Sequence, residues 1–190
     1  MSRESVREAG SLRRGRFLYL PVAAGRLEFA AEVRRTLLAE RPEVVAVELP
    51  GSLEQVFLRA VNRLPEISVI LYPDPEDEEG FVYVPVEPAD PFVEAVRTAR
   101  EIGAEIIFAE PDDLRRPHLP DRLPDSYSLR WVGLEKYVEA CRVLATPRTP
   151  EVERHAAGMA WKLQGAHPLA RAVVVVSLGL LDPLLDAMEQ

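Results

Sequence analysis

Few of the residues that carry most enzymatic chemistry are present in this sequence. Its 190 residues include one cysteine and three histidines. The single cysteine, Cys141, cannot form an internal disulfide, so nothing in the chain requires an oxidising compartment. Its place on an apolar helical stripe predicts a small buried hydrophobic residue rather than a nucleophile. The histidines lack the spacing of metal ligands, and we expect two in surface loops and one on the polar flank of a helix: His118, His167 and His155.

Long apolar runs are also missing. No run approaches the roughly 18 residues that cross a bilayer, and the polar, arginine-rich stretch Met1–Arg16 lacks the apolar core of a secretory signal. The net charge is −8, from 23 basic and 31 acidic residues, which argues against a nucleic-acid surface. We therefore expect a cytoplasmic protein that binds neither membranes nor nucleic acids.

Two common functional motifs are absent as well. No glycine-rich phosphate loop follows an apolar run, so the usual dinucleotide and nucleotide fingerprints are excluded. No Gly-x-Ser-x-Gly sequence occurs, so the nucleophile elbow of α/β-hydrolases is excluded too.

The chain is organised around the stretch Glu43–Ser52. The apolar, mostly β-branched run Val44–Val47 predicts a strand that is covered on both faces, and this strand ends at a carboxylate, Glu48. A Pro-Gly turn follows. Ser52 then occupies the position expected of a helix N-cap, and Gln55 completes a capping box.

Apolar strand-like runs alternate with amphipathic helices along the chain. This order predicts an α/β fold with an open, mostly parallel sheet of about five to six strands and helices on both faces. Residues 1–16 are expected to be a polar leader and residues 17–190 a single α/β domain, which leaves open that the chain is the N-terminal domain of a longer protein. The run 81–86 is expected to be either an added edge strand or a hairpin partner, and the other expected strands are Phe17–Leu20, Val44–Glu48, Ile67–Tyr72, Ile106–Phe108 and Ala172–Val176.

Carboxylates are concentrated where these strands end. In an open parallel sheet, ligands bind beyond the carboxyl ends of the strands, and oxygen-rich rims suit hard divalent cations. The alternative is that the carboxylates only cap the helices that follow. The candidate ligand-binding residues are Glu48, Ser52, Glu87, Glu110 and Asp112, with Asp74 on the same predicted rim; Glu48 and Glu110 are also the candidate metal ligands, and Glu48 the one candidate catalytic residue.

The layout resembles the erythromycin esterase/ChaN/TraB superfamily. The pieces that carry the resemblance are Val44–Leu49, the helical run Glu153–Ala160 and the last strand, Ala172–Ser177. The resemblance implies a hydrolase, in some members metal-dependent, with a histidine after the first strand, a glutamate ending the second and a histidine after the last. Glu48 matches the glutamate. Neither the first strand's exit, Leu20–Ala24, nor the last strand's exit contains histidine.

These departures predict a degenerate member that has kept the scaffold and lost its general base and metal ligands. We therefore expect a domain without catalytic activity or cofactor that binds a protein partner, further domains or a small ligand at the strand ends. The alternative is a hydrolase that holds a divalent metal in a carboxylate-rich site around Glu48. A third possibility is binding of a small molecule at the strand ends without a metal, for which the sequence contains no dedicated motif.

Overall fold

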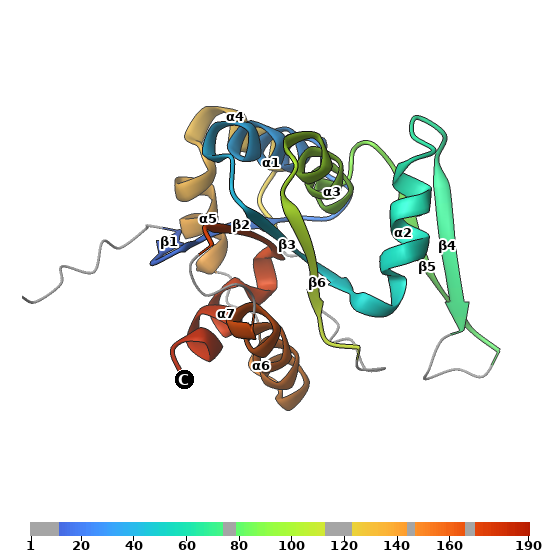
Figure 1. Cartoon of the computed structure of the whole chain (residues 1–190). Coiled ribbons are helices and arrows are strands. Elements are labelled where there is room, and N and C mark those ends of the chain that lie inside the picture. Colours follow the sequence, from blue (N-terminus) through green and yellow to red (C-terminus); the bar gives the residue numbers. More distant parts are fainter. Residues whose placement is uncertain (1–11, 74–78, 113–122, 144–146, 166–169) are drawn as a thin grey trace, which may run out of the picture.

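The computed structural model describes residues 12–73, 79–112, 123–143, 147–165 and 170–190. Within these ranges the chain forms a mixed, mostly parallel five-stranded sheet, a separate two-stranded antiparallel sheet and seven α-helices (Figure 1). The predicted α/β fold with a mostly parallel sheet is confirmed. No helix in these ranges is long and apolar enough to span a bilayer.

The main sheet has the strand order β1–β2–β7–β3–β6. The last four strands in this order run parallel to one another, and the short β1 pairs antiparallel with β2. Figure 1 shows these strands between the α1–α3 pair and the α6–α7 pair. The strand bounds are β1 Arg13–Arg14, β2 Phe17–Val22, β3 Val44–Pro50, β6 Glu105–Glu110 and β7 Ala172–Ser177.

Strands β3 and β7 lie side by side in the sheet interior, and their valine, alanine and leucine residues are all buried. This confirms the strand predicted at Val44, although β3 continues beyond its predicted end to Pro50. Strand β2 also runs further than predicted, through Pro21 to Val22. Pro21 is tolerated inside the strand because, in the part of the chain that the structure describes, β1 pairs only with Phe17 and Leu18, and Pro21 lies on an edge where its missing N–H is not needed.

Alternate side chains of the central strands enter two hydrophobic clusters. Val45 and Val47 belong to one cluster, together with residues of α1, α2 and α3. Val44 and Ala46 belong to the other, together with residues of α6 and α7. The helix bounds are α1 Leu27–Glu40, α2 Glu54–Val61, α3 Pro91–Ile102, α4 Leu129–Val132, α5 Leu134–Arg142, α6 Pro150–Gly165 and α7 Leu181–Met188.

The ends of α3 carry standard local signals. The Asp90 side chain accepts hydrogen bonds from the backbone N–H groups of Phe92 and Val93, and Pro91 occupies the first helical position. Gly103 ends the helix in the left-handed conformation, with φ 73°. Helix α6 also begins at a proline, Pro150, and its apolar stripe is buried.

The run Ile67–Tyr72 was predicted as a third buried strand of the main sheet, and this prediction is wrong. A strand is present there, β4 (Ser68–Pro73), but among the described residues it pairs only with β5 (Phe81–Val86), in a separate antiparallel hairpin. The alternative that 81–86 is a hairpin partner is therefore correct. One face of the hairpin packs on α2, where Ile70 and Val86 are buried, and the other face is exposed.

Candidate functional site

The four parallel strands end at one edge of the main sheet, and two predicted site residues lie there. Glu48 is the third-last residue of β3, and Glu110 is the last residue of β6. Both are buried, with exposures of 0% and 4%. Carboxylates are almost never this buried unless they are paired.

Glu48 replaces a missing main-chain acceptor. The paired part of β3 and β7 ends at Val47 and Val175, and the register of β3 against β6 shifts between Val47 and Pro50. Such an irregularity turns a side chain out of the regular pleat. The Oε2 atom of Glu48 accepts a hydrogen bond from the backbone N–H of Ser177 at 2.5 Å. Its carboxylate therefore joins the ends of the two central strands.

Lys162 of α6 lies at the end of β6. Its Nζ donates to the carbonyl oxygen of Glu110 at 2.6 Å, and lies 3.4 Å from both the Phe108 carbonyl oxygen and Asp112 Oδ2. The ammonium group thus satisfies carbonyl groups where β6 stops. Sequence analysis missed Lys162, and the only signal for it was its position beside the buried stripe of α6.

Ser52 and Asp112, two predicted site residues, are brought together. The Ser52 backbone N–H donates to Asp112 Oδ1 at 2.8 Å. This hydrogen bond is the main cause that lowers the pKa of Asp112, and the charge of Lys162 acts in the same direction while burial opposes it. A side chain at Gly51 would bring its Cβ to 3.3 Å from Asp112 Oδ2, so the backbone approaches the carboxylate closely.

The predicted capping box at Ser52 is wrong. Ser52 lies inside a 3-10 turn, η1 (Gly51–Leu53), and α2 begins only at Glu54 with no side-chain cap. Ser52 offers its backbone N–H to the carboxylate of another loop instead of offering its hydroxyl to a helix.

Glu87 lies beside a different loop, at the exit of β2. A Cβ at Gly25 would be 3.8 Å from Glu87 Oε1. The backbone N–H of Gly25, which has φ 64°, donates to Asp90 Oδ2 at 2.9 Å. Asp90 is thus both the cap of α3 and the anchor of the β2–α1 turn. Burial raises the pKa of Asp90, opposed by its three backbone hydrogen bonds and reinforced by the charge of Glu87.

His155 does not lie on a polar helix flank as predicted. It is 4% exposed on α6, among the residues that face the second hydrophobic cluster. Cys141 is half-buried, and burial raises the pKa of its thiol, which favours the unreactive protonated form. Asp74, His118 and His167 lie outside the described residues.

Among the described residues, no three His, Cys, Asp or Glu side chains are grouped as metal ligands. Apart from Glu48 and Glu110, the predicted candidates fall into two small sets. Ser52 and Asp112 lie with Lys162 at the β3 and β6 ends, and Glu87 lies near Gly25 and Asp90 at the β2 exit. Their hydrogen bonds mainly hold loops and strand ends. The exposed polar atoms of Ser52, Asp112 and Lys162 can bind a polar group by hydrogen bonding or charge.

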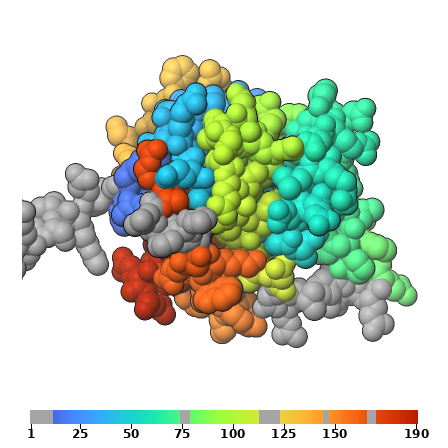
Figure 2. Space-filling model, viewed as in Figure 1, coloured from blue at the N-terminus to red at the C-terminus, as the bar shows by residue number. Residues whose placement is uncertain are grey.

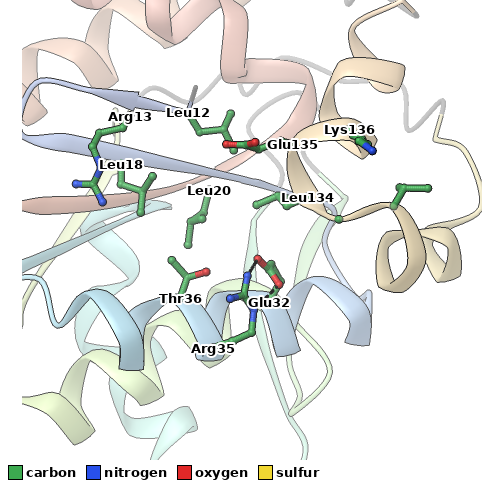
Figure 3. Close-up of a pocket in the computed structure, with 12 residues that line it drawn as sticks. Leu12, Arg13, Leu18, Leu20, Glu32, Arg35, Thr36, Leu134, Glu135 and Lys136 are labelled. Atoms are coloured by element: carbon green, nitrogen blue, oxygen red, sulfur yellow. Dashed lines mark hydrogen bonds and ion pairs between the residues drawn. The ribbon is translucent and has the colours of Figure 1, made fainter. Parts of the chain in front are cut away.

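A separate hollow lies beside the edge strand β1 and its neighbour β2. It has a volume of about 480 Å³ and is lined by none of the predicted site residues. Figure 3 shows its leucines between charged residues of α1 and the start of α5. Arg35 there is paired with Glu32, and Arg13 with Glu40, so both of these cations are already neutralised.

No protein-family model, curated protein or solved structure matches this chain. The resemblance described above therefore stays a prediction.

Proposed function

We propose that this chain is a non-catalytic α/β domain, related to the erythromycin esterase/ChaN/TraB superfamily, that binds a protein partner or small ligand at the C-terminal ends of its parallel strands. One observation carries the proposal: Glu48, the residue on which catalysis would centre, is fully buried and hydrogen-bonded to the Ser177 backbone. A general base or metal ligand must reach the reacting group, and this carboxylate instead stabilises the strand ends.

The rim around Glu48 supports the binding part of the proposal. Asp112 and Ser52 are exposed, and Lys162 is partly exposed. They offer a carboxylate, a hydroxyl and an ammonium group within one hydrogen-bonded set. A ligand that carries both hydrogen-bond donors and acceptors fits this mixture better than an anion or a cation alone.

A metal-dependent hydrolase is the second candidate, because Glu48 and Glu110 are both buried at the ends of the adjacent strands β3 and β6. In that case they would be the first metal ligands, and Glu87 and Asp112 would have to move to complete the site. This candidate requires rearrangement of the hydrogen bonds of Glu48 and Asp112.

Thermal unfolding separates the two candidates. Protein treated with chelator is given magnesium, manganese, zinc or iron(II) in turn, as wild type and as Glu48→Gln. A metal at about a hundred times its dissociation constant adds roughly 2.7 kcal/mol, which raises the midpoint of a domain of this size by roughly 5–10 °C. We expect no shift that depends on Glu48. A shift of that size in wild type, abolished in Glu48→Gln, would establish the metal site and overturn the non-catalytic proposal.

The binding part is tested in the same assay with a panel of amino acids, nucleotides and organic acids. We expect stabilisation by a bound compound to be lost in Asp112→Asn and kept in Asp125→Asn, a matched change in the exposed cap of another turn. Stabilisation that Asp112→Asn leaves unchanged would assign the ligand to another surface.

We also infer that the sheet is the middle layer of three, with α1 and α3 on one face and α6 and α7 on the other. The support is the alternation of the central strands between the two hydrophobic clusters. Measured hydrogen exchange tests this arrangement: β3 and β7 should exchange more slowly than the hairpin strands, because both of their faces are covered.

A further inference from the structure

We infer that the exposed face of the β4–β5 hairpin is a docking surface for a partner polypeptide that presents apolar side chains flanked by lysine or arginine. This surface is separate from the strand-end rim. We name it the hairpin face and define it by six residues: Val69, Leu71, Pro73, Phe81, Tyr83 and Pro85.

The pairing of the two strands places these six side chains together. The cross-strand partners are Val69 with Pro85, Leu71 with Tyr83, and Pro73 with Phe81. Because side chains alternate along a strand, these three pairs lie on one face of the hairpin. All six residues are exposed, and the exposures of Leu71 and Tyr83 are 55% and 67%.

An antiparallel hairpin with one wet face normally carries polar residues on that face. Here both faces are apolar. The inner face contains Ile70 and Val86, which are buried, and packs on α2. Figures 1 and 2 show the hairpin at the margin of the molecule, beyond α2. A contiguous exposed apolar surface with aromatic members is typical of protein–protein interfaces.

The charge around the hairpin face identifies the class of partner. From Glu66 to Glu87 the sequence contains seven acidic residues and no lysine, arginine or histidine. Arg63, the nearest basic residue before this stretch, is paired with Glu66. The hairpin segment therefore carries acidic and no basic side chains in its sequence, which favours a partner whose apolar contact is flanked by cationic side chains. A second copy of this chain, which carries a net charge of −8, would bring the same sign of charge.

The experiment selects random peptides displayed on phage against the immobilised full chain and then measures the affinity of the enriched peptides. We expect them to combine apolar residues with lysine or arginine and to bind more weakly as salt is raised. In the double variant Leu71→Thr/Tyr83→Thr, which keeps β-forming residues in a cross-strand pair, affinity should fall by about tenfold or more. In Trp161→Gln, a change at a comparably exposed aromatic residue on α6, affinity should be unchanged.

Circular dichroism and the unfolding midpoint show whether the double variant keeps its fold. Both of its side chains are more than half exposed, so we expect little change. Four outcomes would overturn the proposal. The first three are the absence of enriched peptides, enrichment of acidic or uncharged peptides, and peptide binding that the double variant does not weaken. The fourth is a dimer, detected by light scattering, that the double variant dissociates, because a second copy would then occupy the hairpin face. None of these outcomes depends on Glu48 or the strand-end rim.

Discussion

The Oε2 atom of Glu48 and the backbone nitrogen of Ser177 lie 2.5 Å apart, and this hydrogen bond joins the ends of the two central strands. It forms where the regular pairing of β3 with β7 has stopped. A carboxylate in a fully buried position costs free energy unless its oxygens are hydrogen-bonded. The contact thus explains why a glutamate is tolerated at the centre of the fold, and it gives that glutamate a structural task.

Replacement of Asp90 by alanine should destabilise the protein. The side chain accepts hydrogen bonds from Phe92 and Val93 as the cap of α3 and from Gly25 in the β2–α1 turn. Loss of a helix cap costs about 0.5–2 kcal/mol, and we expect the upper part of that range because a loop is released as well. Urea unfolding of wild type and Asp90→Ala measures this loss of stability. Asp125→Ala, at the cap of a three-residue turn, is the matched control and should cost less; equal losses would contradict the double role.

Asp90 should also make stability depend on pH. Its pKa in the folded protein is raised above the ordinary value of 3.8, mainly by burial. The folded state therefore binds the proton of the Asp90 carboxyl group more tightly than the unfolded state. The resulting contribution to the free energy of unfolding is fully present below pH 3.8 and is lost as pH rises through the raised pKa.

Asp90→Asn removes this titration. The free energy of unfolding of wild type, minus that of Asp90→Asn, should fall as pH rises through this window and then stay level. Urea unfolding of both proteins from acidic to neutral pH measures the difference. A difference that rises with pH would show that the backbone hydrogen bonds outweigh burial.

Gly158→Ala should destabilise the protein although alanine is the better helix former. A Cβ at Gly158 would lie 2.8 Å from Cβ and 3.0 Å from Cγ of Pro111, a rigid ring that cannot turn away. Overpacking of this kind costs about 1–3 kcal/mol, against a gain of about 1 kcal/mol from helix propensity. We expect a net loss of about 1 kcal/mol in urea unfolding. Gly165→Ala, at the end of the same helix with nothing within 4 Å, should be neutral or stabilising.

The sequence predicts best where the signal is local. The cap, first-turn proline and terminal glycine of α3 are signals of this kind, because each lies next to the helix end that it defines. The strand at Ile67–Tyr72 shows the limit. Its apolar run indicates a strand, but whether it joins the main sheet depends on its partner, and here the partner is β5 rather than a parallel strand.

The candidate site shows the same division between local and distant signals. Glu110 ends β6, and Glu48 lies two residues before the end of β3 rather than at its last residue. Sequence analysis did not reveal that Ser177 would supply the hydrogen bond to Glu48, or that Lys162 would cover the end of β6, because these contacts span 129 and 52 residues. His155 was misplaced for a related reason: a polar residue beside a core stripe looks exposed until a second layer covers it.

The most direct test of the account is chemical unfolding of Glu48→Ala, beside Glu48→Gln and the exposed control Glu54→Ala. The alanine variant leaves the Ser177 N–H without its acceptor, and an unsatisfied buried donor costs about 1–3 kcal/mol. We expect the free energy of unfolding to fall by about 2 kcal/mol or more in Glu48→Ala. It should fall less in Glu48→Gln, which keeps one acceptor oxygen, and change little in Glu54→Ala. A Glu48→Ala protein as stable as wild type, or more stable, would contradict it, because gains of that kind arise when a strained active-site residue is removed.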